Sequence, residues 1–374
     1  MNDDELYEKL REHLDGLPVG MPATESRVEI RLLKMVFSPV EARLATFLGL
    51  TPEPAKRIWR RVRRAKDASL PATEQEVGAA LEAMWRKGLI NGGKDKNTGE
   101  WYFASAPLAI GIFEYQLNRL TKEFAEAFEQ YVHEAFAGEI LGVKTPQLRT
   151  IPVEEAIPDD RFVMNYDQLR HIIETRSPIS LAECVCRQTK RVLGGSCEHP
   201  EEFRETCFQF GAAAHSYVEQ GQARFVTKEE ALEVLRRAQE EGLVIQPSNS
   251  QRPFCICCCC GCCCEVLTNA KRYDKPARFF ATNHFSEVDP DLCAACGTCV
   301  ERCPMGAATL DDDVAKIDVD RCIGCGVCIP TCSAGAITLK KRGEELVPPA
   351  DTVEMYTRMM EEKAARQRGG GPAA

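Results

Sequence analysis

Residues 293–310, CAACGTCVERCPMGAATL, align without a gap on residues 322–339, CIGCGVCIPTCSAGAITL. The two segments form an internal repeat with an offset of 29 residues, and each has four cysteines in the spacing C-x2-C-x2-C-x3-C. Two-residue spacers allow three thiols of one tight loop to converge, and Gly297 and Gly326 relieve backbone crowding there. The longer last spacer carries the fourth thiol away from its own loop. The repeat therefore predicts two equivalent thiolate sites.

This spacing is the bacterial ferredoxin pattern for two [4Fe-4S] clusters, in which the fourth cysteine of each half binds the other cluster. Pro304 follows Cys303 as in that pattern, whereas Ser333 stands in the equivalent place after Cys332. Two zinc knuckles would need a finger-length spacer between C-x2-C pairs, which the doubled run lacks. Two neighbouring clusters favour electron transfer over a single redox site. We expect one cluster on Cys293, Cys296, Cys299 and Cys332, and the second on Cys322, Cys325, Cys328 and Cys303.

Twelve of the 20 cysteines form a second group before the repeat, and eight of these twelve lie within residues 255–264, CICCCCGCCC. Side chains alternate between the faces of a strand, so one set of thiols would be exposed; we therefore do not expect this run to be a core strand. One or two further Fe-S clusters are expected, with a zinc tetrahedron or an active site with an open iron position as alternatives. The predicted ligands are Cys184, Cys186, Cys197, Cys207, Cys257, Cys259, Cys260, Cys262, Cys263 and Cys264, followed by Cys255 and Cys258.

Local patterns suggest how these cysteines are held. Cys184 and Cys186 would point from one face of an extended strand, because residues i and i+2 share a face. Phe203, Cys207 and Phe210 would share a face of a helix. A scaffold helix is expected over residues 227–242, with a capping box between Thr227 and Glu230 and a terminating Gly242.

Residues 1–183 contain no cysteine and should fold by ordinary burial. Helices are predicted over 26–37, 39–50, 52–66 and 73–90, followed by a hairpin over 92–107 that turns at Asn97-Thr98-Gly99. This order resembles the winged-helix domain, in which residues 73–88 would be the DNA-reading helix. Glu74, Glu76 and Glu82 on that helix would repel phosphates, and the basic residues lie on 56–66 instead. We therefore expect a docking or structural wing rather than specific DNA binding.

A long helix is expected over residues 111–140, because Phe113, Leu117, Leu120, Phe124 and Phe128 recur at helical spacing. A proline-containing connector should follow it. The sequence contains no G-x-G-x-x-G, P-loop or H-E-x-x-H motif, so nucleotide-binding and hydrolase functions have no support.

The composition fits a globular cytoplasmic protein of 374 residues, 44% hydrophobic and 28% charged, with a net charge of -9 that disfavours general polyanion binding. We expect no membrane insertion and no signal peptide, because long apolar stretches and a basic start are missing. A reducing cytoplasm favours metal binding over disulfides for clustered cysteines. Residues 287–340 carry nine acidic and four basic side chains, which suits docking to a basic redox partner protein.

The whole chain resembles multi-domain 4Fe-4S ferredoxin proteins of anaerobic bacteria and archaea. The matching segments are the doubled motif, CVCR at 184–187, TKEEALE at 227–233, EGLV at 241–244, CCCCGCCC at 257–264 and APLAIGIFEYQ at 106–116. At Cys255 and Cys258 the resemblance implies residues other than cysteine. It implies an N-terminal winged-helix-like segment but names no reaction.

We thus expect an α+β multidomain protein with a helical winged-helix-like N-terminal module, a Cys-rich metal-binding middle domain and a ferredoxin-type dicluster module. Its predicted function is low-potential electron transfer as a subunit or partner of an anaerobic oxidoreductase system, rather than stand-alone catalysis. The alternatives are an Fe-S-dependent, redox-sensing winged-helix transcription regulator, or an oxidoreductase with its own substrate at the Cys-rich site. The expected divisions are an N-terminal helix (1–24), the winged-helix-like domain (25–106), a long helix with connector (107–160), the Cys-rich domain (161–286), the ferredoxin domain (287–342), and a C-terminal helix with disordered tail (343–374).

Overall fold

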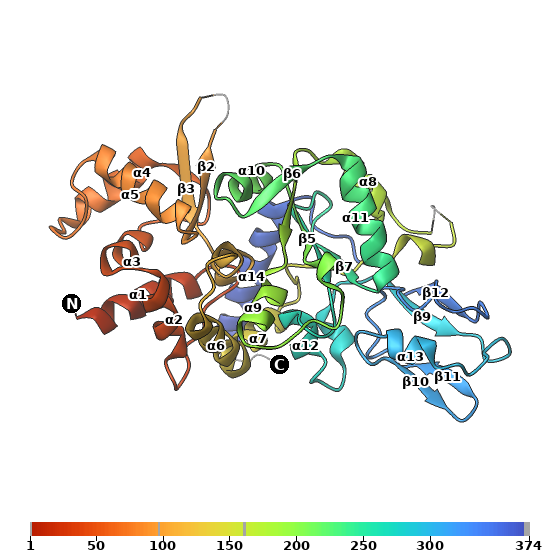
Figure 1. Ribbon diagram of the computed structural model, residues 1–374. Helices are drawn as coiled ribbons and strands as arrows, with labels where there is room; N and C mark the ends of the chain where they lie inside the picture. Colours follow the sequence, from red (N-terminus) through yellow and green to blue (C-terminus); the bar gives the residue numbers. More distant parts are fainter. Residues whose placement is uncertain (1, 96–97, 160–161, 370–374) are drawn as a thin grey trace.

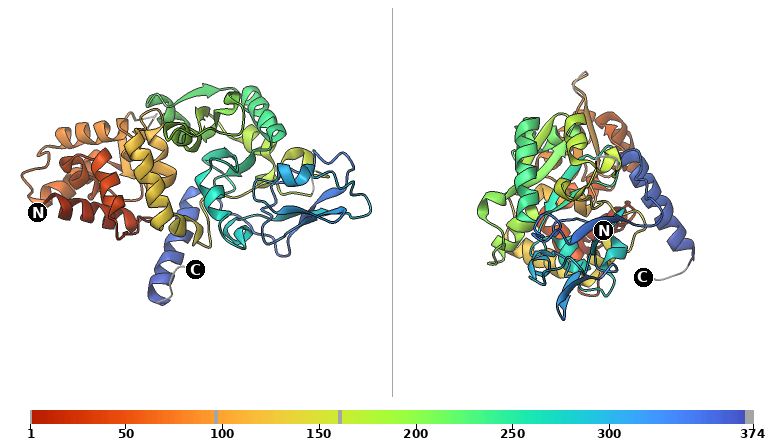
Figure 2. Two further views of the ribbon diagram at one scale, coloured as in Figure 1. Left: turned by 60° about the horizontal axis from the view of Figure 1, so that its bottom comes forward. Right: turned by 90° about the vertical axis from the view of Figure 1, so that its right-hand side faces the viewer.

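A computed structural model describes residues 2–95, 98–159 and 162–369 of the chain. The N-terminal helices and the segment with the cysteine repeat lie at opposite ends of the molecule, with a five-stranded sheet between them (Figures 1 and 2). The mixture of helices and sheets agrees with the expected α+β class. Tip residue Asn97 and tail residues 370–374 lie outside the described part of the chain.

The N-terminal part consists of small helices beside a three-stranded antiparallel sheet in the order β1-β3-β2. Three of the helices begin with a capping box, in which Asn2, Ser38 or Thr73 accepts from the third helical amide and a glutamate caps in return. Each of the four helices predicted between residues 26 and 90 contains an observed one, and the predicted hairpin is β2 and β3. The elements are α1 (Asp3–Asp15), α2 (Val28–Val36), α3 (Pro39–Ala45), β1 (Glu53–Pro54), α4 (Ala55–Ala65), α5 (Glu74–Arg86), β2 (Ile90–Lys94) and β3 (Trp101–Ser105).

The helix predicted over residues 111–140 begins only at Lys122. Thr121 caps α6 by accepting from the amide of Phe124 at 3.1 Å, and the left-handed backbone of Asn118, with φ of 65°, interrupts the helical path before it. Phe113, Leu117, Phe124 and Phe128 are nevertheless buried, as the apolar spacing predicted. The connector elements are η1 (Leu108–Ile112), η2 (Glu114–Gln116), α6 (Lys122–Tyr131), η3 (Val132–Phe136), α7 (Ala137–Leu141), η4 (Glu154–Ala156) and η5 (Asn165–Asp167).

An antiparallel sheet in the order β6-β4-β5-β8-β7 forms the centre of the molecule. Helices α8 and α11 cover one face, where Leu235 packs with Phe208, Ile256 and Cys258. As predicted, Thr227 caps α11 and Gly242 ends it in the left-handed conformation, with φ of 91°. The elements are α8 (Leu169–Thr175), β4 (Ile179–Glu183), α9 (Val185–Val192), η6 (Glu201–Phe203), β5 (Glu205–Phe210), α10 (Ala212–Glu219), β6 (Ala223–Val226), α11 (Lys228–Glu241), β7 (Val244–Pro247), β8 (Cys255–Cys259), α12 (Glu265–Ala270) and η7 (Pro276–Phe279).

Three predictions about the conformation around the cysteines are wrong: those for Cys184 and Cys186, for Cys207, and for the run that begins at residue 255. Cys184 is not in a strand but caps α9, which contains Cys186 and buries Val185 and Thr189 on one face. Cys207 lies in strand β5 rather than a helix, because Phe208 and Phe210 alternate with it in a period of two.

The cysteine run also begins as an interior strand, β8, contrary to expectation. Both faces of the sheet are covered, so the alternating thiols are buried instead of exposed. Cys255 is 3% exposed and Cys258 is 2% exposed.

The repeat forms two small antiparallel pairs, β9 with β12 and β10 with β11. β10 and β12 begin at equivalent positions of the two halves, Ala308 and Ile337. The first half contains the short helix α13, whereas Pro330 stands in the second half where the first has Glu301, and a proline cannot donate within a helix. The elements are β9 (His284–Val288), α13 (Thr298–Arg302), β10 (Ala308–Asp311), β11 (Val314–Ile317) and β12 (Ile337–Lys341).

The last helix, α14 (Thr352–Gly369), returns to the N-terminal half of the molecule. Met355 and Met359 are buried in the same core as Leu6 and Phe128. The Lys363 ammonium donates to the carbonyl of Leu17 at 3.1 Å and lies 3.3 Å from the Glu139 carboxylate. None of the described helices combines the length and apolarity that a membrane crossing requires.

Candidate metal centres

The eight cysteines of the repeat fall into two spatial sets. The Cys299 thiol interacts electrostatically with Cys293, Cys296 and Cys332. The Cys325 thiol does so with Cys322, Cys303 and Cys328. Each set therefore combines three cysteines of one half with the fourth cysteine of the other.

Backbone amides donate to these sulfurs in a repeated arrangement. The amide of Ala307 donates to Cys303 Sγ at 3.2 Å, and the equivalent amide of Ala336 donates to Cys332 Sγ at 3.3 Å. Such bonds favour the thiolate form and tune the potential of a bound Fe-S cluster. The chain thus supplies both the sulfurs and the donors that a cluster requires.

The two sets differ in their access to solvent. Cys296 of the first set is exposed, whereas Cys322, Cys325 and Cys328 of the second are each only 8% exposed. Burial raises the pKa of Cys328 to about 12. A cluster on the second set would therefore lie inside the molecule, and one on the first set near its surface.

Comparison with known protein families identifies the segment that contains the cysteine repeat. Residues 286–333 match the 4Fe-4S dicluster domain. The chain thus carries a dicluster domain of the ferredoxin kind over this part of its length. Comparisons with curated proteins and with solved structures gave no significant match.

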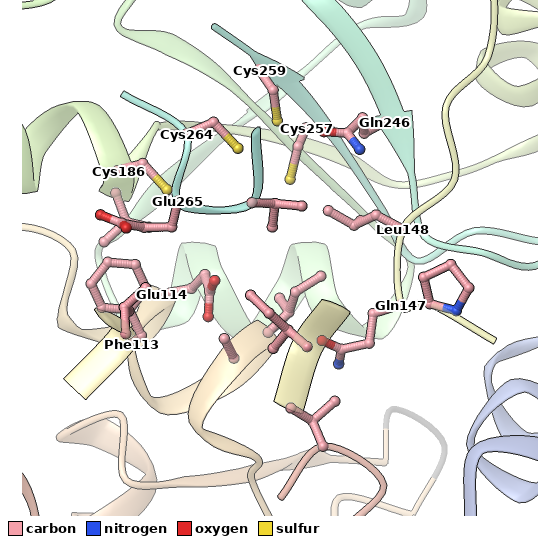
Figure 3. A pocket seen from close by; sticks show the side chains of 18 of the residues that line it. Phe113, Glu114, Gln147, Leu148, Cys186, Gln246, Cys257, Cys259, Cys264 and Glu265 are labelled. Carbon is pink, nitrogen blue, oxygen red and sulfur yellow. The ribbon is translucent and has the colours of Figure 1, made fainter. Parts of the chain in front are cut away.

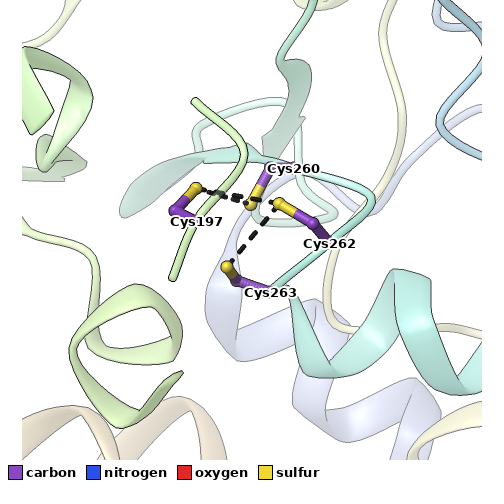
Figure 4. A group of neighbouring side chains, drawn as sticks. All are labelled: Cys197, Cys260, Cys262 and Cys263. Carbon is purple, nitrogen blue, oxygen red and sulfur yellow. Dashed lines mark hydrogen bonds between the residues drawn. The ribbon is translucent and has the colours of Figure 1, made fainter. Parts of the chain in front are cut away.

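Outside the dicluster domain, four thiols form a compact group, which we call the thiol tetrad: Cys197, Cys260, Cys262 and Cys263. All four sulfurs lie within 4.8 Å of one another (Figure 4). Cys197 comes from the loop after α9, and the other three come from the turn after β8. Hydrogen bonds from the Cys262 and Cys263 thiols lower the pKa of Cys260, which favours the thiolate that binds metals.

The other thiols of this region line a cavity of about 120 Å³ between the sheet and the connector helices. Figure 3 shows Cys186, Cys257, Cys259 and Cys264 pointing into it from one side, with Glu114 opposite. We call Cys184, Cys186, Cys207, Cys257, Cys259 and Cys264 the cavity thiols.

The cavity thiols influence one another's ionisation. The Cys264 sulfur accepts from Cys186 and Cys259, which lowers its pKa well below the usual value. A hydrogen bond from Cys186, helped by the charge of Arg187, lowers the pKa of Cys184 to about 7. Hydrogen bonding from neighbouring thiols and burial instead raise the pKa of Cys186, Cys207 and Cys259 well above the usual value. Cys184 and Cys264 are therefore the cavity thiols that ionise most readily.

Cys255 belongs to neither group. Cys258 borders the cavity but is not counted among the cavity thiols, because its side chain alternates with those of Cys257 and Cys259 along β8. Cys258 packs with the α11 side of the sheet, away from its neighbours Cys257 and Cys259. Cys255 is buried behind the cavity thiols, beside Cys257. The structure thus separates the twelve cysteines into a tetrad, six cavity thiols and these two.

Three charged residues near the thiols were not predicted. Arg187 is 3% exposed and donates to the carbonyls of Phe203, at 2.7 Å, and Cys258, at 3.0 Å. Burial raises the pKa of both Glu114 and Glu265, in the cavity wall, to about 7. Glu265 directly follows Cys264, and Arg187 directly follows Cys186, whereas no cysteine stands next to Glu114 in the sequence.

The dicluster domain packs directly against the cysteine run. A side chain at Gly261, between Cys260 and Cys262, would place its Cβ 2.7 Å from the carbonyl oxygen of Pro304. Glycine is therefore the residue that allows this close approach. Cys259 and Cys264 also share one hydrophobic core with Cys325, and Cys303 packs on its edge.

Proposed function

We propose that this chain is an iron-sulfur electron-transfer protein whose dicluster domain exchanges electrons with a further Fe-S centre on the cavity thiols. A [4Fe-4S] cluster supplies reversible one-electron chemistry at a potential set by its surroundings. The dicluster domain and the cysteine-rich region support this role. The observation that carries the proposal is the shared core of Cys259, Cys264 and Cys325, because it places members of the two sets of thiols in one continuous buried cluster.

The proposed ligands follow the spatial sets. Cys293, Cys296, Cys299 and Cys332 would hold the outer cluster of the dicluster domain, and Cys303, Cys322, Cys325 and Cys328 the inner one. Cavity thiols around Cys186, Cys259 and Cys264 would hold the further centre. Electrons would enter or leave beside exposed Cys296 and reach the cavity through the inner set.

The partner that fits this arrangement is a redox protein with a basic surface. Glu301 lies close enough to the exposed Cys296 thiol to interact with it, and Asp311, Asp312 and Asp313 are exposed at the β10–β11 hairpin. Opposite charge accelerates encounter between redox partners. We propose that the chain serves an anaerobic oxidoreductase system as its electron-transfer component.

The test uses the full chain, purified without oxygen, and compares Cys264→Ala with Cys258→Ala. Cys264→Ala should lose the iron and acid-labile sulfide of one centre, and EPR of the reduced protein should lose the magnetic interaction between that centre and the inner cluster. Cys258→Ala, on the opposite sheet face, should retain both. If Cys264→Ala leaves iron, sulfide and the EPR spectrum unchanged, the cavity holds no redox centre.

A docking role is proposed for the winged-helix-like N-terminal segment. Helix α4 exposes Lys56, Arg60, Arg63 and Arg64 on one face. By contrast, α5 exposes Glu74 and Glu76 in its first turn. A basic face beside an acidic helix fits an acidic protein surface better than the uniformly negative backbone of DNA.

A further inference from the structure

The thiol tetrad differs from the cavity thiols in the spacing of its sulfurs. Cys197 Sγ lies 3.9 Å from Cys260 Sγ and 3.7 Å from Cys262 Sγ, and Cys262 Sγ lies 3.6 Å from Cys263 Sγ. In a tetrahedron with metal-to-sulfur distances of about 2.3 Å, neighbouring sulfurs are about 3.8 Å apart. The observed distances are those of four ligands around one ion.

A cubane cluster would need a wider arrangement. Its four thiolates bind four different irons, and the irons and sulfides between them hold the thiolates farther apart than ligands of one ion. The tetrad leaves no such space at its centre, because all its sulfurs lie within 4.8 Å of one another. We therefore propose that Cys197, Cys260, Cys262 and Cys263 hold a single tetrahedral metal ion of the zinc class.

The surroundings fit a closed structural site. Cys260 and Cys263 are 2% and 5% exposed, and four sulfurs fill a tetrahedron without an open position. Four thiolates and one divalent ion leave a net negative charge, and the buried guanidinium of Arg187 lies close enough to Cys260 and Cys197 to interact with both. A buried charge of one sign is tolerated when such a partner is present.

The chain path explains how the site assembles. The turn after β8 brings Cys260, Cys262 and Cys263 together, while Cys197 arrives from the loop after α9. An ion here would fix that loop to the end of the sheet. Because α9 contains Cys186 and begins at Cys184, the same ion would also hold these two cavity thiols in position.

This inference does not depend on the proposed electron transfer, because the ion would carry no sulfide. The first experiment is elemental analysis and X-ray absorption on the full, anaerobically purified chain. We expect one equivalent of zinc with four sulfur neighbours at about 2.3 Å. Mononuclear iron with the same four sulfurs would also support a single-ion site, with a different occupant. Zinc coordinated by nitrogen or oxygen, or the absence of any four-sulfur mononuclear ion, would overturn it.

The second experiment compares Cys262→Ala with Cys258→Ala in the same chain. Cys262→Ala should lose that one equivalent and keep the sulfide content of the native protein. Cys258→Ala, two positions before Cys260 but outside the tetrad, should keep the ion. A loss of sulfide in Cys262→Ala without loss of a mononuclear ion would assign the tetrad to a cluster. The X-ray absorption spectrum of the native chain shows whether the tetrad holds a single ion even if the variant does not fold.

Discussion

Glu114 carries a buried carboxyl group in the cavity wall, where it accepts a hydrogen bond from the amide of Gly111 at 2.7 Å. Burial raises its pKa from 4.5 to about 7. The folded protein therefore holds a proton there that the unfolded chain releases above about pH 4.3. This contribution to stability is complete below that pH and is lost as pH rises through 7.

Replacing Glu114 with Gln should remove this loss, because an amide stays neutral at every pH. We expect the advantage of Glu114→Gln over the native protein in free energy of unfolding to grow by roughly 2–3 kcal/mol between pH 5 and pH 8. Thermal unfolding at both pH values measures the effect. Exposed Glu123 on α6 provides the control Glu123→Gln, which should show no comparable pH-dependent gain. Equal behaviour of both variants would show that Glu114 is ionised in the folded protein.

Gly261 makes the closest contact between the cysteine run and the dicluster domain. In Gly261→Ala the new methyl would lie 2.7 Å from the Pro304 carbonyl, so the two segments must separate. We expect a loss of roughly 1–3 kcal/mol, as for other overpacked positions. In α7, Gly138 has no atom within 4 Å of an added Cβ, and Gly138→Ala should stabilise the helix by about 0.5–1 kcal/mol. Chemical denaturation of both variants, compared with the native chain, tests this; equal stabilities would refute the proposed close contact.

At the scale of the secondary-structure elements, we expect the fourth cysteine of each half of the repeat to bind the cluster of the other half. Cys303→Ala should damage the cluster proposed for Cys322, Cys325 and Cys328 and largely spare the one beside it in sequence. Cys332→Ala should do the reverse, so each variant is the control for the other. EPR and Mössbauer spectra of the reduced proteins distinguish the inner from the outer cluster. If each variant instead loses the cluster of its own half, the ligands are not exchanged.

The charges on helices α4 and α5 bear on whether the N-terminal segment binds DNA. We expect no sequence-specific DNA binding, because Glu74 and Glu76 are exposed where base contacts would fall. Anisotropy titrations against genomic fragments, with and without metal, should show only weak, salt-sensitive binding. Specific recognition would exceed non-specific binding by roughly a thousandfold or more. A salt-resistant preference for one fragment would favour the transcription regulator.

Some of the helices and strands could be predicted from the sequence and others could not. Capping residues and apolar spacing predicted the N-terminal helices and α11, because these signals are local. The strand conformation of Cys207 and of residues 255–259 depends on partners far along the chain, since β5 lies between β4 and β8. Cys184 and Cys186 line the same cavity, but from the start of a helix and not from one face of the expected strand.

The cysteine repeat predicted the two sets of dicluster thiols, because its spacing directly reflects cluster geometry. The division of the other twelve cysteines was not predictable in this way. It depends on which face of β8 each thiol occupies and on where the loop carrying Cys197 returns. Those positions are fixed by the tertiary fold.

In the molecule as a whole, α14 ties the N-terminal core to the cavity. Met355 is fully buried in that core, so Met355→Ala should cost about 2–4 kcal/mol of unfolding free energy. Val353, two residues earlier on the same helix, is 69% exposed. Val353→Ala should therefore change the free energy of unfolding by less than about 0.5 kcal/mol. Denaturant unfolding followed by tryptophan fluorescence reports on the N-terminal half, which contains Trp59, Trp85 and Trp101. Equal stability of the two variants would mean that α14 is not part of the core.

The position of α14 also bears on the order in which the protein can be made. This helix leaves the ribosome after every other described helix and strand, yet its Met359 lines the cavity. The cavity thiols, on α9, β5, β8 and the start of α12, are thus translated before that part of the wall exists. If the proposed centre is inserted during this interval, its insertion requires no reopening of a finished core.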